Sequence, residues 1–118
     1  MSQLVVLYDA CVLYSAPLRD LLMQLALSDL FRAKWSNHIH EEWIKAVLKN
    51  KPHITREKIN HVRDLMDRHV RDCKVSDYEA IIPSLNLPDQ NDRHVLAAAI
   101  KSSASVIVTY NLKDFPKH

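Results

Sequence analysis

Two short apolar segments restrict the fold of this chain more than any other feature. Leu4 to Tyr8 (LVVLY) and Ala104 to Tyr110 (ASVIVTY) are rich in β-branched residues and apolar on both faces, as strands of a covered parallel sheet are. Helical spacing of apolar residues fills the stretch between them. We therefore expect an α/β domain of three layers, α/β/α, whose central sheet is parallel and has Leu4 to Tyr8 as a central strand.

The remaining elements follow from caps, prolines and apolar spacing. We first expect a helix from Ser15 to about Leu27 with Pro17 in its first turn, and then a strand from Phe31 to Trp35. Two helices should follow, one capped by Ser36 or Asn37 and a long one after Thr55. The last two helices are a shorter one from Tyr78 to Leu85, which Pro83 bends or ends, and a buried one that begins near Asp92 and runs to Ile100.

Composition excludes several classes of protein. The 118 residues are enough for one domain, which we expect to span residues 1–118. The chain has no glycine, so the glycine-rich phosphate loops of nucleotide-binding proteins cannot be present. It also lacks a membrane-length apolar run and a leader pattern, so we expect a soluble cytoplasmic protein without membrane partners. Cys11 and Cys73 are interpreted as buried or half-buried free thiols.

Charge is unevenly distributed along the chain. From Lys45 to Lys74 there are nine Lys or Arg residues and four acids, a local excess of +5, whereas the rest of the chain carries −3. A basic half beside an acidic pocket suits a polyanion that is held by its phosphates. A solvated helix face would give the same charge run, and this alternative stays open.

Acidic residues stand where the expected elements meet one edge of the sheet. Asp9 directly follows the first strand, and Asn111 and Asp114 follow the last. Ligands of parallel sheets bind beyond the carboxyl ends of the strands. Glu42 and Asp92 lie early in helices that can point into the same crevice. We expect Asp9, Glu42, Asp92 and Asp114 to converge there, with Asp89 and Asn111 at the margin; the alternative is that Asp89 and Asp92 only cap a helix.

Clustered carboxylates suit a hard divalent cation. Mg²⁺ and Mn²⁺ take oxygen ligands and keep several waters, so carboxylates from scattered positions make an adequate site. Such an ion activates water and neutralises charge on a phosphodiester. Arg93, beside the expected acids, is a candidate phosphate contact because guanidinium binds phosphate through two hydrogen bonds. Trp35 and Trp43 are expected to pack in the core, and the His38 and His40 pair is not expected to share a metal.

The ordered motifs LYDACVLYSAPLRDLL, WSNHIHEEW, LPDQNDRHVLAAAI and VIVTYNLKDFP resemble the PIN-domain nucleases, especially the branch of VapC-type toxins. The resemblance implies a PIN-like fold and a Mg- or Mn-dependent endonuclease for single-stranded RNA. It also implies an antitoxin partner and a homodimer. Its catalytic and metal-binding acids map to Asp9, Glu42, Asp92 with its neighbour Asp89, and Asp114; Ser15, Ser36 and Asn111 are polar neighbours that are candidates for substrate contact.

Three features leave alternatives open. Glu41 stands beside Glu42, so the second acid can shift by one residue. Asn111 occupies a place where many family members have Asp, and this favours a catalytically silent RNA- or protein-binding module as the alternative function. The sequence ends at His118, soon after the fourth motif, where family members continue with a strand and a helix; either one sheet edge is short or the chain is a truncated form.

Overall fold

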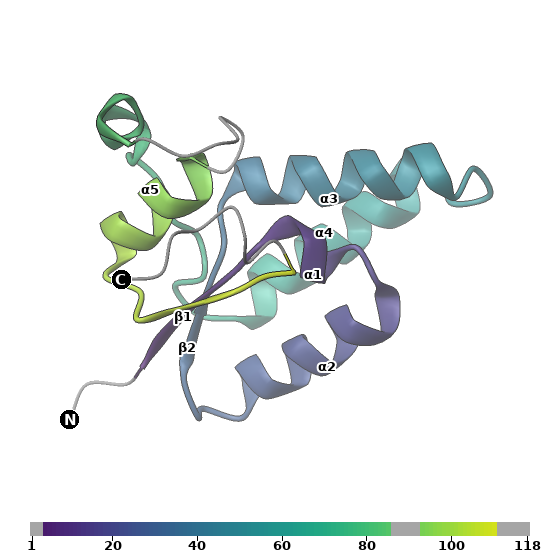
Figure 1. Cartoon of the computed structure of the whole chain (residues 1–118). Helices are drawn as coiled ribbons and strands as arrows, with labels where there is room; N and C mark the ends of the chain where they lie inside the picture. Colours follow the sequence, from purple (N-terminus) through teal and green to yellow (C-terminus); the bar gives the residue numbers. More distant parts are fainter. Residues whose placement is uncertain (1–3, 86–92, 111–118) are drawn as a thin grey trace.

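The computed structural model describes residues 4–85 and 93–110 (Figure 1). Its elements are β1 (Val5–Tyr8), α1 (Ala10–Leu13), α2 (Ala16–Leu27), β2 (Arg32–Lys34), α3 (Asn37–Asn50), α4 (Arg56–His69), the 3₁₀ helix η1 (Glu79–Ser84), α5 (Arg93–Ser102) and β3 (Val106–Val108). None of the described helices combines the length and the apolar character that crossing a membrane requires.

The three described strands form one parallel sheet in the order β2-β1-β3. Val6 of β1 lies opposite Ala33 on one side and Val106 on the other. This confirms that the first strand is central and parallel to the last. The expectation that the last strand is covered on both faces was wrong, because β3 lies at an edge of the described sheet and Val106 is 41% exposed.

Helices cover both faces of this sheet. Figure 1 shows α2 and α5 on opposite sides of the strands. Residues of α2 and α4 line a common groove, so α4 lies on the α2 side, whereas α5 packs against β1 and η1. The predicted α/β architecture with a parallel central sheet is therefore confirmed.

Local capping explains where the long helices begin. The Ser36 hydroxyl accepts a hydrogen bond from the N–H of Ile39 at the start of α3, and Thr55 does the same for Lys58 in α4. Both caps were predicted. Pro83 lies inside η1, which ends one residue later. The predicted helix from Tyr78 is thus a short 3₁₀ helix, since a proline removes a backbone donor.

Turns that other proteins build with glycine are built here with short polar residues. Asp29, Asp72, Asp77 and Ser103 have φ between 54° and 64°, and Asp tolerates this left-handed region better than most residues. At the end of α5, the N–H of Ala104 reaches the carbonyl of Ala99 at 2.9 Å across Ser103. This closing bond satisfies a helix-end carbonyl and sets the direction of β3.

Both tryptophans belong to the core, as predicted. Trp35 and Trp43 are at most 1% exposed, and Trp35 stacks on Tyr8 with ring centroids 6.1 Å apart. Cys11 and Cys73 are free thiols, the first half-buried and the second buried. The core therefore joins β1, β2 and α3 directly below the edge at which the strands end.

A polar network inside this core fixes α3 against α4. The Trp43 ring N–H donates to His40 Nδ1 at 3.0 Å, so this nitrogen carries no proton. His40 Nε2–H then donates to Asp67, which also accepts from the Trp35 ring N–H; both contacts are 2.8 Å. Burial lowers the pKa of His40, in agreement with a neutral ring. The contact with Asp67 is thus a hydrogen bond rather than an ion pair.

Removal of the Asp67 carboxylate should destabilise the fold. Burial raises the pKa of Asp67, but hydrogen bonds from His40 and Trp35 outweigh this effect and hold the pKa below its ordinary value. In Asp67→Ala two buried donors lose their acceptor, and we expect the free energy of unfolding to fall by about 2 to 4 kcal/mol. Urea unfolding measures this. Asp64→Ala, an exposed position on the same helix, is the matched control and should change stability by less than about 0.5 kcal/mol; equal losses would contradict the network.

Candidate active site at the carboxyl ends of β1 and β3

Asp9 lies where β1 and β3 end. Its Oδ1 accepts the N–H of Ala10 at 2.7 Å and so caps α1. Its Oδ2 accepts the hydroxyl of Thr109, which follows β3, at 2.8 Å, and lies 3.6 Å from the Cys11 thiol. A carboxylate has about four acceptor positions, and these contacts occupy three. Asp9 is 4% exposed, so its orientation is fixed, and the described part of the chain leaves one of its acceptor positions without a partner.

Helix α1 is short, yet it is anchored at both ends. Asp9 caps its first turn, and the guanidinium of Arg19 in α2 donates to the carbonyl of Leu13 at 2.7 Å. The same guanidinium lies 4.7 Å from the ring centroid of Trp43 in α3. Because one arginine links α1, α2 and α3, the side chains of α1 have a fixed position relative to α3.

Glu42 of α3 contacts α5 and lies beside α1. Its Oε1 lies 2.6 Å from Nε2 of His94, a residue of α5 that is 2% exposed. Glu41 points elsewhere, since it pairs with Arg63 of α4 at 2.8 Å and its side chain is 61% exposed. Consecutive helix residues are rotated by about 100°, which explains the separation. Of the two acids, Glu42 is therefore the one that lies beside α1.

His94 is held between Glu42 and a second histidine. The rings of His38 and His94 stack with centroids 3.6 Å apart. Burial, followed by the nearby His94, lowers the pKa of His38. His38 and His40 face different partners, as expected for positions two apart on a helix. Within the described part of the chain, His94 Nδ1 and Arg93 Nε are buried without a hydrogen-bond partner.

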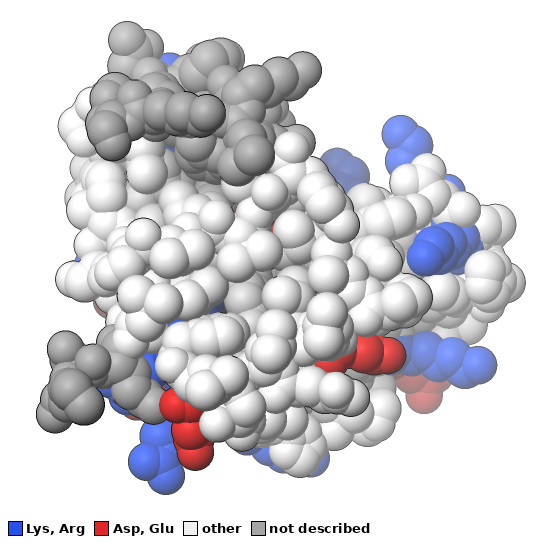
Figure 2. Space-filling model, turned by 60° about the horizontal axis from the view of Figure 1, so that its bottom comes forward, with Lys and Arg blue, Asp and Glu red and all other residues white. Residues whose placement is uncertain are grey.

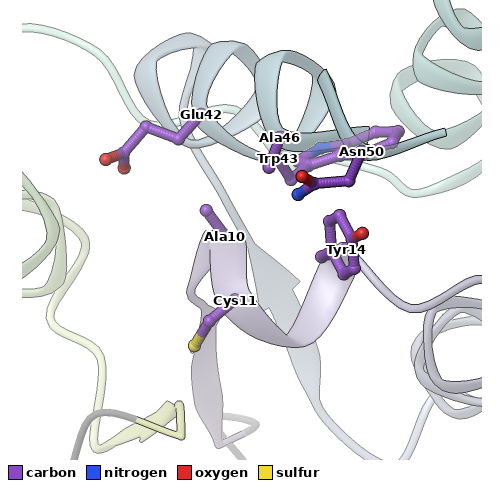
Figure 3. A pocket seen from close by; sticks show the side chains of 7 residues that line it. All are labelled: Ala10, Cys11, Tyr14, Glu42, Trp43, Ala46 and Asn50. Carbon is purple, nitrogen blue, oxygen red and sulfur yellow. The ribbon is translucent and has the colours of Figure 1, made fainter. Parts of the chain in front are cut away.

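A pocket of about 330 Å³ opens beside these groups between α1 and α3 (Figure 3). Figure 3 shows Glu42 at one end and Tyr14 with Asn50 at the other. The lining residues are Ala10, Cys11, Tyr14, Glu42, Trp43, Ala46 and Asn50. Ala10 and Cys11 directly follow Asp9 in the chain, so the pocket is lined by Glu42 and by the two residues next to Asp9.

The structure brings some of the predicted site residues together and leaves others undescribed. Asp9 follows β1 and caps α1, whereas Glu42 of α3 contacts His94, the neighbour of Arg93 in α5. Asp89, Asp92, Asn111 and Asp114 lie outside the described residues. Among residues 4–85 and 93–110, no group of three or more His, Cys, Asp or Glu side chains could hold a metal ion. A complete metal site would therefore need acids from outside these ranges.

The two serines have different surroundings. Ser36 is fully buried and serves as the cap of α3, so a substrate contact by its side chain does not fit the structure. Ser15 is half-buried at the start of α2, and its side chain makes no capping bond. Of the two, only Ser15 keeps surface that a ligand could reach.

Three residues of the site were not identified by sequence reasoning as site residues. Thr109 ends an apolar run, and its position after the last strand was an available signal. No sequence signal indicated the link between His94 and Glu42, because the two residues are 52 positions apart. Tyr14 gave no sequence signal, since nothing local predicts that a four-residue helix turns it toward α3.

The sequence of this chain is similar to known proteins at the level of a family and of one short segment. The family model described as PIN domain matches residues 5–113. A 39-residue segment, 33% of this chain, is 54% identical to a protein of Mycobacterium tuberculosis that is provisionally named ribonuclease VapC50. The matched segment covers 22% of that protein's length.

Proposed function

Because the chain belongs to the PIN domain family, we propose that it is a nuclease that cleaves single-stranded RNA with the help of Mg²⁺ or Mn²⁺. The observation that carries the proposal is the placement of two carboxylates. Glu42 of α3 lines a pocket, and Asp9 directly precedes Ala10 and Cys11, which line the same pocket from α1. The short segment shared with a protein named as a ribonuclease supports RNA as the substrate.

The donor groups suit a hard divalent cation. Asp9 keeps one acceptor position, and Glu42 is about one third exposed, so both can supply oxygen ligands. We assign the other ligands to Asp92, Asp114 and Asp89. A bound Mg²⁺ or Mn²⁺ supplies an activated water and neutralises phosphate charge. The chain's own residues fix the ligands: Thr109 and the N–H of Ala10 orient Asp9, and His94 orients Glu42.

Substrate contact falls to groups around the acids. We assign a phosphate contact to Arg93, which adjoins His94 in α5 and has a buried Nε without a partner in the described residues. Ser15 and Asn111 are further candidates, and Ser36 is removed from this set because it is buried. The likeness to the protein named VapC50 supports a toxin role, with an antitoxin that blocks the pocket and a homodimer as the working form.

RNA cleavage by the purified protein tests this function. We expect it to cut single-stranded RNA when Mg²⁺ or Mn²⁺ is present, to stop when EDTA removes the metal, and to resume when excess metal is returned. Double-stranded RNA and single-stranded DNA of the same sequence serve as comparison substrates. Cleavage that persists in EDTA would contradict the metal. RNA binding without cleavage in any metal would favour the silent module to which Asn111 points.

A further inference from the structure

The pocket between α1 and α3 extends well beyond the Glu42 carboxylate. Glu42 and Asn50 both line it and are eight residues apart on α3, which corresponds to about 12 Å along a helix at 1.5 Å per residue. The far end is formed by Tyr14 and Asn50 (Figure 3). This far end has no part in holding a metal, so the pocket has space for a piece of substrate next to the reacting bond.

We propose that this pocket binds one base of the RNA, the base adjacent to the phosphodiester bond that is cleaved. The inference rests on the proposed function of the same site. A nucleobase is flat, apolar on its faces and polar at its edge. The pocket walls match this pattern, because Ala10 and Ala46 present apolar surface, Tyr14 presents an aromatic ring and Asn50 presents an amide. Stacking on an aromatic ring and hydrogen bonds to the base edge are how single strands are bound.

Positive charge around the pocket favours a polyanion over an apolar protein segment. Lys45 and Lys49 are exposed on α3, and helical rotation places both within about 60° of the face that carries Glu42. Lys51 lies with its Nζ 5.0 Å from the centroid of the Tyr14 ring. Figure 2 shows Lys and Arg side chains gathered at the side of the molecule formed by the outer ends of α3 and α4. Phosphates that flank a bound base would lie among these lysines.

The position of Tyr14 is rigid enough for this role. Its backbone N–H donates to the carbonyl of Ala10 at 3.1 Å, and its own carbonyl lies 3.4 Å from the Arg19 guanidinium that also holds Leu13. A stacking platform whose backbone is already fixed loses little conformational freedom when a base arrives. The ring therefore adds affinity for a base without reorganisation of α1.

RNA substrates with single missing bases test the proposal. In each substrate one nucleotide on either side of the cleaved bond is replaced by an abasic one, and single-turnover cleavage gives the RNA concentration for half-maximal rate. For the wild type we expect one abasic position to raise this concentration about tenfold. Tyr14→Leu should raise it about tenfold with intact RNA and should abolish the difference between intact and abasic substrates. Tyr14→Phe keeps the ring and should behave as the wild type.

Two further results would overturn the proposal. A wild type that cleaves RNA equally well with every abasic substrate has no base pocket, although its nuclease function stands. If Tyr14→Leu does not change the RNA concentration for half-maximal cleavage, Tyr14 does not stack on a base, and a protein segment is the occupant of the pocket instead. Circular dichroism checks that the variant folds. If it does not, Asn50→Ala, at the exposed end of α3, replaces it and should show the same reduced sensitivity to the abasic position.

Discussion

Replacement of Glu42 by Gln should lower the rate of RNA cleavage by about 10²- to 10³-fold, whereas Glu41→Gln should leave it within about twofold. The two acids are adjacent in the chain, but only Glu42 lines the pocket and contacts His94. Gln keeps an oxygen that can accept from His94, so the substitution removes the negative charge and little else. The measured quantity is the single-turnover rate of cleavage at saturating Mg²⁺.

Glu41→Gln is the matched control because it removes the same charge one residue away. Its partner Arg63 also reaches Asn37 at 3.0 Å, and an exposed ion pair of this kind contributes less than about 1 kcal/mol to stability. Both variants should therefore have nearly the same free energy of unfolding as the wild type. If Glu41→Gln loses cleavage and Glu42→Gln does not, the second acid of the site has been assigned one residue too late.

Asp9→Asn should lower cleavage by about 10³-fold or more, because Asp9 is the acid fixed at the end of the central strand. Three neighbours orient the carboxylate, since Ala10, Cys11 and Thr109 are all donors to it. Asn keeps the oxygen that caps α1, and Asn and Asp are equally good caps, so stability should change by less than about 1 kcal/mol. Single-turnover cleavage and thermal unfolding of the same preparation give both quantities.

A purely structural role for Asp9 predicts a different rate of cleavage in Asp9→Asn. If the carboxylate served only to join β3 to α1, Asp9→Asn would leave the rate of cleavage unchanged. Thr109→Val separates these roles further, since it removes the hydroxyl that orients Asp9 and leaves the carboxylate charged. We expect it to reduce cleavage less than Asp9→Asn does.

The fold was predictable where local signals are strong. The apolar run before Asp9 predicted the central strand, and Ser36 and Thr55 predicted the starts of α3 and α4, because caps and β-branched runs act within a few residues. Helix α1 was missed. Four residues are too few to show periodicity, and the helix is stabilised by Arg19, which belongs to the next helix.

The site was less predictable because its contacts join distant parts of the chain. Asp9 and Thr109 are 100 residues apart, and Glu42 and His94 are 52 apart. The sequence correctly predicted that Asp9 lies at the carboxyl end of the first strand, because a strand end is a local feature. It could not show that Ser36 is buried, because burial depends on how α3 packs on the sheet. The predicted places of Asp89, Asp92, Asn111 and Asp114 lie outside the described residues and stay predictions.

Binding of Mn²⁺ to the RNA-free protein, followed by electron paramagnetic resonance, tests the central claim most directly. The wild type should remove Mn²⁺ from the free-ion signal in a saturable way, and Asp9→Asn and Glu42→Gln should each weaken this binding at least about tenfold, while Glu41→Gln binds as the wild type does. If the wild type and all three variants bind Mn²⁺ equally, or if none binds while RNA is still cleaved, Asp9 and Glu42 do not form the metal centre.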